Sequence, residues 1–279
     1  MEEQLKQFWE RGFAVFHGVL PVGVVADALS VAEGRTLHYD PIFATVFGED
    51  YDRKRLQAHF PLQCTQALKA VQRIVRRNII HPANMQWRAQ QWVVLKSLPG
   101  GPEQEAHSDF PAFEIARARD KTDSIQAGLM VGLLPNTKLI VYEKCFGQAD
   151  VRQRRVIEFG AGDVVLFRGD LIHAGAPYAD TNFRIHTTLT VKGIEWQNNA
   201  IEPAPFKAFK CRYCAFLSKS ARGVYNHTRF CEGNPKKTAI VAAYQKKNAK
   251  GGTCSVCRRQ FAKYNTMIKH RKKCAQMTN

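Results

Sequence analysis

Residues 161–175 read AGDVVLFRGDLIHAG, and this stretch decides the fold expected for residues 1–200. Four apolar residues, Val164–Phe167, follow a Gly-Asp turn and predict a buried strand. A second Gly-Asp turn leads directly into Leu171-Ile172-His173, which places a histidine shortly after that strand. The stretch therefore predicts a β core that carries a candidate metal ligand, His173.

Apolar runs of the same kind occur on both sides of this stretch and are separated by Gly, Pro, Asn and Asp turns. Such short strands predict a sandwich or barrel of the jelly-roll kind. Earlier segments have helical periodicity, so the expected class is α+β, with N-terminal helices and a β core. We expect strands at 13–16, 92–95, 127–134, 139–142, 156–159 and 183–191, and helices at 2–10, 21–31 and 53–80, the last interrupted at Pro61.

Three polar features of this β region belong together. His107-Ser108-Asp109 follows a strand and a Gly-rich turn, His173 comes some sixty residues later, and Arg184 begins the last strong strand. Residues i and i+2 of an extended segment point the same way, so His107 and Asp109 can bind one ion. Two imidazoles and one carboxylate form the facial triad of non-haem iron(II). Arg184 is suited to hold a carboxylate through paired charge-assisted hydrogen bonds.

These motifs, with Leu98-Pro99-Gly100-Gly101 before the first and Ala161–Phe167 before His173, resemble those of the iron(II)/2-oxoglutarate-dependent dioxygenases, particularly the phytanoyl-CoA dioxygenase-like branch. The resemblance implies a double-stranded β-helix and iron held by His107, Asp109 and His173. It further implies 2-oxoglutarate bound by Arg184, oxidation of a C–H bond, and ascorbate as a supporting reductant. Alkylated-nucleic-acid demethylases carry a further arginine soon after the co-substrate arginine. Here Ile185–Thr190 follows instead, which argues against a close relationship to them.

The last 79 residues repeat one metal-binding pattern, C-x2-C-x12-H-x3-C, at an offset of 43. Three thiolates and one imidazole suit structural zinc, so two Zn(II) ions are expected. The pattern resembles CCHC-type zinc fingers. Phe261 and Met267 occupy the small-core positions of the second copy, whereas the first has Ser218 and Val224, with Phe216 as a substitute aromatic. The ligand sets are Cys211, Cys214, His227 and Cys231, then Cys254, Cys257, His270 and Cys274.

Charge is divided unevenly along the chain. Residues 201–279 hold 18 Lys and Arg against two acids, whereas residues 1–200 hold 23 against 22. A basic tail with zinc modules favours a polyanion, and we expect nucleic acid as the partner, DNA rather than RNA, with chromatin proteins as a further candidate. No apolar run is long enough to span a membrane. Cysteine use fits a reducing compartment, and the tail suggests the nucleus.

The expected organisation is a dioxygenase domain at 1–200, a linker at 201–210, zinc fingers at 211–231 and 254–274, and a linker at 232–253 that allows the fingers to orient independently. The leading hypothesis is an oxygenase that hydroxylates or oxidatively demethylates a nucleic-acid base. Three alternatives stay open: a hydroxylase of chromatin or ribosomal proteins, a small-molecule hydroxylase, and a nucleic-acid-binding protein with a silent oxygenase domain.

Overall fold

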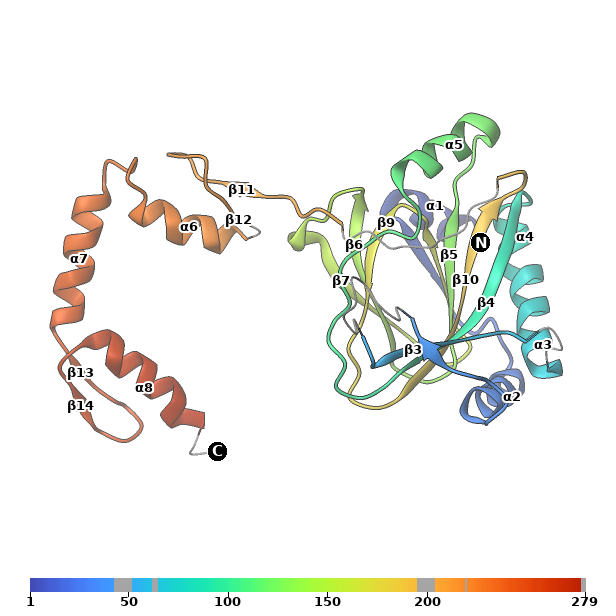
Figure 1. The fold of residues 1–279 in the computed structure, drawn as a ribbon, viewed down its shortest axis with the longest axis horizontal. Coiled ribbons are helices and arrows are strands. Elements are labelled where there is room, and N and C mark those ends of the chain that lie inside the picture. Colours follow the sequence, from blue (N-terminus) through green and yellow to red (C-terminus); the bar gives the residue numbers. More distant parts are fainter. Residues whose placement is uncertain (43–51, 62–64, 195–203, 219, 277–279) are drawn as a thin grey trace. The chain divides into compact units, whose positions relative to one another are not determined.

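The computed structural model describes residues 1–42, 52–61, 65–194, 204–218 and 220–276. The chain divides into two compact units, Met1–Lys207 and Ala208–Asn279 (Figure 1). Residues 201–203 of the predicted linker lie outside the described residues. Residues 204–207 belong to the first unit, where Ala204 N donates to Ala106 O (2.7 Å) and Lys207 N donates to Ala149 O (2.7 Å).

The first unit is built on two antiparallel sheets. The larger has the strand order β1-β8-β5-β10-β4-β3-β2 and the smaller β7-β6-β9. This arrangement agrees with the expected jelly-roll core and mixed helix–sheet class. The strands are β1 (Phe13–Phe16), β2 (Asp40–Pro41), β3 (Arg55–His59), β4 (Trp87–Ser97), β5 (Ala127–Gly132), β6 (Thr137–Phe146), β7 (Arg154–Phe159), β8 (Val164–Arg168), β9 (Leu171–Gly175) and β10 (Asn182–Val191).

The central strands β5, β8 and β10 of the larger sheet are buried on both faces, which explains their nearly continuous apolar sequences. In β8, Val164 and Leu166 join the core beneath the helices, whereas Val165 and Phe167 join the core between the two sheets. The same alternation places Arg184 and His186 of β10 on the inner face, opposite Leu95 and Val93 of β4.

Helices cover one side of this core, next to the larger sheet (Figure 1). Residues of α1, α2 and α3 pack on the outer face of the larger sheet, and α5 is an excursion between Asp109 and β5. No helix in the described ranges is both long and apolar enough to cross a membrane. The elements are α1 (Glu2–Arg11), α2 (Val22–Glu33), α3 (Gln66–Val75), the π-helix η1 (Arg76–Ile80), α4 (His81–Ala83), α5 (Ala112–Thr122) and the 3₁₀ turn η2 (Val151–Gln153).

The structure corrects one prediction and adds an element. Residues 55–59, predicted as part of a helix, form β3, where Ala58 pairs with Val94 of β4. Sheet pairing overrides local propensity here, because β4 offers an edge that the local sequence of residues 53–60 does not reveal. Helix α5, which begins after Pro111, was not expected.

The second unit contains a hairpin followed by a helix, twice, and a helix between them. The elements are β11 (Phe209–Lys210), β12 (Leu217–Ser218), α6 (Ala221–Phe230), α7 (Lys237–Ala249), β13 (Gly252–Thr253), β14 (Gln260–Phe261) and α8 (Tyr264–Gln276). Helix α7 contacts both neighbours: Tyr244 packs edge-on against Phe230, and Asn248 Oδ1 accepts a hydrogen bond from Asn265 N (3.0 Å). The segment expected to be a linker that lets the modules orient independently thus contains a helix that contacts both of them.

Candidate metal centre and cysteine clusters

His107 and His173 face one another across a β-bridge. His107 N donates to His173 O (2.9 Å) and His173 N donates to His107 O (2.8 Å), so the backbone itself fixes their separation. Asp109 lies two residues further along the same segment. One ligand atom from each of the three residues lies within 4.8 Å of the others, and all three side chains are buried. The structure thus brings together the three side chains predicted to hold iron.

Each histidine ring is oriented by its own chain. Nδ1 of His107 contacts Glu105 O (2.7 Å), and Nδ1 of His173 contacts Leu171 O (3.0 Å). A carbonyl can only accept, so each Nδ1 carries the proton and each Nε2 presents a lone pair. This is the tautomer that a metal-binding histidine requires. Because the acceptors are backbone carbonyls two residues upstream, side-chain patterns in the sequence give no sign of them.

The electrostatics of the cluster suit a cation. Burial, and then the nearby His173, lower the pKa of His107 to about 4. Burial raises the pKa of Asp109, but His173 and His186 outweigh it and hold that pKa well below its ordinary value. Burial lowers the pKa of His173, and Asp109 outweighs it, so that pKa is raised. An ionised carboxylate buried beside two imidazoles is matched by a divalent ion, so the donor set fits iron(II).

Arg184 is a buried cation beside this cluster. It is 3% exposed, its Nη1 donates to Ser97 Oγ (3.0 Å), and its Nε has no hydrogen-bond partner in the described part of the chain. No carboxylate of those residues pairs with it, and burial lowers the pKa of its guanidinium. Buried charges normally have a counter-ion. The site therefore fits a ligand that supplies a carboxylate, as 2-oxoglutarate does.

Ser97 and Lys96 are adjacent residues at the end of β4. Ser97 lies beside Arg184, but the Lys96 ammonium lies over the rings of Tyr39 (5.3 Å) and Phe183 (5.4 Å), on the other face of β4. Strand alternation is the reason, since adjacent residues point to opposite faces. Sequence reasoning missed Tyr178, whose ring lies 5.6 Å from the Arg184 guanidinium. It follows a Gly-Ala-Pro turn and no periodic pattern singles it out.

Two further residues, His186 and Gly128, adjoin the cluster. His186 Nε2 lies 3.8 Å from Asp109 Oδ2, and its ring stacks on Phe167 at an interplanar angle of 19°. Gly128 of β5 comes so close that an added Cβ would lie 2.3 Å from the Phe167 ring and 2.9 Å from Asp109 Oδ2. Only glycine leaves room for both at this position.

Gly169 ties the α5 excursion to the core at both ends. Phe110 N donates to Gly169 O (3.0 Å), and Gly169 N donates to Gln126 O (2.9 Å). A Cβ at Gly169 would lie 2.6 Å from the Phe110 ring. The chain thus leaves the core one residue after Asp109 and returns to the same backbone unit before β5.

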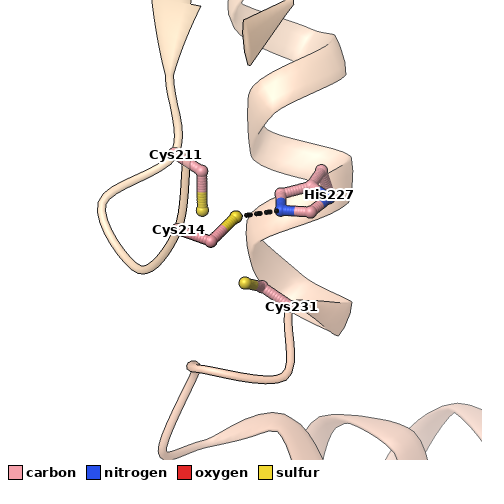
Figure 2. A group of neighbouring side chains, drawn as sticks. All are labelled: Cys211, Cys214, His227 and Cys231. Atoms are coloured by element: carbon pink, nitrogen blue, oxygen red, sulfur yellow. Dashed lines mark hydrogen bonds between the residues drawn. The ribbon is translucent and has the colours of Figure 1, made fainter. Parts of the chain in front are cut away.

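Both predicted cysteine sets come together in the second unit. In each set, one ligand atom per residue lies within 4.8 Å of the others. Figure 2 shows the first set: Cys211 and Cys214 come from the loop after β11, His227 from α6, and Cys231 from the end of that helix. The thiol–imidazole distance is 3.2 Å for Cys214 Sγ–His227 Nε2 and 3.0 Å for Cys257 Sγ–His270 Nε2.

In each set the pKa of the first thiol, Cys211 or Cys254, is lowered, whereas the pKa of the last thiol, Cys231 or Cys274, is raised. Burial raises the pKa of Cys211, but hydrogen bonds from Thr228, Tyr213 N and Cys214 outweigh it and lower that pKa to about 6. Burial and the neighbouring Cys257 and Cys254 raise the pKa of Cys274 to about 11. Clustered thiols resist a second negative charge, and a divalent cation removes that resistance. Three thiolates and an imidazole fit zinc.

The small cores differ between the two modules. In the second, Met267 is buried and the Phe261 ring lies 4.8 Å from that of His270. In the first, Phe216 stacks on His227 at 4.0 Å, in the role expected of a substitute aromatic, yet it is 41% exposed. The first module therefore buries less apolar surface around its ligands.

No protein-family model matches this chain, and no curated protein matches it. Solved structures do resemble it. HygX from Streptomyces hygroscopicus, with nickel and 2-oxoglutarate bound, matches with a TM-score of 0.53 and 13% identity over 71% of this chain and 90% of that one.

The non-heme alpha-ketoglutarate-dependent epimerase SnoN from nogalamycin biosynthesis matches with a TM-score of 0.51 and 14% identity, covering 74% and 92% of the two chains. A prolyl hydroxylase from Trichoplax adhaerens, in complex with a hypoxia-inducible-factor peptide fragment, gives 0.51 and 14% over 68% and 88%. The first unit thus has the fold of 2-oxoglutarate-dependent oxygenases.

Proposed function

We propose that this chain is an iron(II)/2-oxoglutarate-dependent oxygenase that hydroxylates or oxidatively demethylates a nucleic-acid base. Its two Cys3His modules bind zinc and deliver the enzyme to its polymer in the nucleus. The observation that carries the oxygenase is the pairing of the buried cluster His107, Asp109 and His173 with the buried, carboxylate-free Arg184. Both features lie in a fold shared with HygX, whose structure holds nickel and 2-oxoglutarate.

The residues have separate tasks in this proposal. His107, Asp109 and His173 would hold the ion, and Arg184 with Ser97 would receive the distal carboxylate of the co-substrate. When bound, iron(II) would supply oxidation by dioxygen: one oxygen atom enters the substrate C–H bond as a hydroxyl, and the other enters succinate as 2-oxoglutarate loses CO2. The carbonyls of Glu105 and Leu171 keep the rings from rotating. Burial of the whole cluster keeps bulk water away.

Charge supports nucleic acid as the substrate class. The second unit is strongly basic, and Arg222, Arg229, Lys269 and Arg271 lie on the helices that carry the zinc ligands, with Lys263 just before the second of them. Exposed rings accompany these cations: Tyr225 is 63% exposed, with the Arg229 guanidinium 5.7 Å from its centre. Cations and exposed aromatic rings together are typical of surfaces that bind phosphates and stack bases.

The test is succinate release by the full-length protein loaded with iron(II) and zinc, in ascorbate and 2-oxoglutarate. Parallel reactions contain duplex DNA, single-stranded DNA, RNA or histones, followed by mass spectrometry of the nucleosides or peptides. We expect nucleic acid to stimulate succinate formation and to acquire an oxidised or demethylated base. His107→Ala removes a ligand and should abolish both, and Lys121→Gln on α5 serves as a matched surface control.

Each contrary result has a defined meaning. Stimulation by histones alone would replace the base by a protein side chain as substrate. Succinate formation that no polymer alters would indicate a small-molecule substrate. A folded protein that binds neither iron(II) nor 2-oxoglutarate in calorimetry would overturn the oxygenase and leave a binding protein.

A further inference from the structure

The first unit contains a long basic segment without a single acid. Residues 53–102 hold nine Lys and Arg and no Asp or Glu, although residues 1–200 as a whole are nearly balanced. The remainder of residues 1–200 therefore holds 14 basic and 22 acidic residues. Basic and acidic residues are therefore unevenly distributed within residues 1–200, although their numbers nearly balance.

Several of these cations are already engaged by the fold. Arg55 is buried and donates to Gly175 O (3.0 Å), Arg88 donates to the carbonyls of Met85 and Trp87, and Lys96 lies over two aromatic rings. Arg53 and Lys54 directly precede β3. The remaining four lie on the outside of one continuous helical segment made of α3, η1 and α4. We call them the α3–η1 face: Lys69, Arg73, Arg76 and Arg77.

All four side chains of the α3–η1 face are exposed. Within the residues that the structure describes, none has a hydrogen-bond or ion-pair partner. The opposite side of the helix packs against the core, where Leu68, Val71 and Val75 are completely buried. The face is thus a rigid basic stripe, held in place by the residues behind it.

Local helix energetics do not explain this stripe. Lys69 and Arg73, and Arg73 and Arg77, are four residues apart, and like charges at that spacing destabilise a helix. Basic residues stabilise a helix at its C-terminal end, but this helical segment continues through η1 to Ala83. In the π-turn, His81 N donates to Arg76 O, and Pro82, which has no N–H, follows. It leaves Arg76 and Arg77 exposed together.

We propose that the α3–η1 face binds the phosphate backbone of a nucleic acid, as a second contact surface in addition to the zinc modules. From Lys69 to Arg77 the helix rises about 12 Å, and duplex DNA carries one charge per about 1.7 Å of its axis, so several phosphates lie within reach of the four cations. The face lies outside the larger sheet, away from the buried cluster on the inner side. It therefore holds flanking polymer and not the reacting base.

This inference rests on the proposed polymer partner, so the experiment separates the two. Fluorescence anisotropy with the full-length, zinc- and iron-loaded protein measures affinity for a labelled 30-mer, as duplex DNA, single-stranded DNA and RNA, from 50 to 400 mM KCl. The variant is Arg73→Gln/Arg76→Gln/Arg77→Gln. The control, Lys6→Gln/Arg119→Gln/Lys144→Gln, makes the same change in charge on α1, α5 and β6.

We expect the Arg73/Arg76/Arg77 variant to lose about 10- to 100-fold in duplex affinity and to reduce the slope of log K against log [KCl] by about 2 to 3. The control triple should change the slope by less than 1, and a triple Arg→Lys variant should keep it near the wild-type value. Succinate formation without polymer should be the same in all of them, because none of these residues touches the site.

An equal loss in the control triple would show a general charge effect and overturn the inference. So would unchanged binding in the variant, and the zinc modules would then be the whole interface. If vesicles with 30% phosphatidylserine bound the wild type but not the variant, while nucleic-acid affinity stayed unchanged, the face would belong to a membrane surface. Absence of nucleic-acid binding by the wild type would refute the proposed polymer partner as well.

Discussion

At the scale of the single residue, Arg184 is the clearest sign of a carboxylate-binding site. A buried guanidinium without a carboxylate destabilises the protein that contains it, and binding of a dicarboxylate relieves that cost. We expect 2-oxoglutarate with iron(II) to raise the melting temperature of the wild type by several degrees. Arg184→Met should melt at or above the ligand-free wild type and should not respond to 2-oxoglutarate, as differential scanning calorimetry would show.

The same variant separates co-substrate binding from metal binding. Because Arg184 does not ligate the ion, Arg184→Met should retain iron(II) in equilibrium dialysis. Its affinity for 2-oxoglutarate should fall by about 10- to 100-fold, the loss of a charge-assisted pair. Equal affinity for 2-oxoglutarate in both proteins would remove Arg184 from the site.

Asp163 provides a prediction on pH. Burial raises its pKa, but hydrogen bonds from Gly160 N (2.8 Å), Gly18 N (2.8 Å) and His17 outweigh it, so the pKa is lowered. A carboxyl whose folded-state pKa is lowered stabilises the fold above its ordinary pKa of about 4, and loses that contribution as pH falls through the lowered value. Asp163→Asn should cost about 1–2 kcal/mol at pH 7 in urea unfolding. This difference should shrink steadily below pH 4; a constant difference would contradict the assignment.

At the scale of the element, α7 links the two cysteine modules. Asn248 of α7 accepts a hydrogen bond from Asn265 N in the first turn of α8, where a helix N–H has no partner of its own. Asn248→Ala should destabilise the start of α8 by about 1 kcal/mol, as loss of an N-cap does. Hydrogen exchange at residues 264–267 should quicken about fivefold, whereas the exposed Asn226→Ala on α6 should leave it unchanged. Equal exchange in both variants would show that α7 does not cap α8.

The elements also show how far sequence reasoning reaches. Strands that are buried on both faces, such as β8 and β10, were predicted because burial requires apolar residues, and these are visible in the strand's own sequence. Strand β3 was not, because its pairing partner β4 lies some 40 positions away and only tertiary contact makes it a strand. The three metal-binding candidates and Arg184 were found from spacing. Tyr178 and the two orienting carbonyls were not, because one follows a turn and the others are backbone atoms.

At the scale of the whole molecule, two units with separate cores predict two separate transitions. A zinc-selective chelator should remove the helices of residues 208–276 and lower nucleic-acid affinity by at least about tenfold at 150 mM KCl, because small Cys3His modules depend on their ion to fold. The first unit should keep its own calorimetric transition and its polymer-free succinate formation. Loss of both transitions together would show that the units fold as one.

Gly169 has a consequence for how this architecture can change over time. The backbone leaves the core at Phe110 and returns at Gln126, and both residues are hydrogen-bonded to Gly169. The segment between them is therefore anchored independently of its own sequence. We expect an insert of different length or charge between these two anchors to leave the position of Asp109 unchanged. The α5 segment, where Phe113 is 63% exposed, can therefore vary in sequence while the metal-binding candidates keep their places.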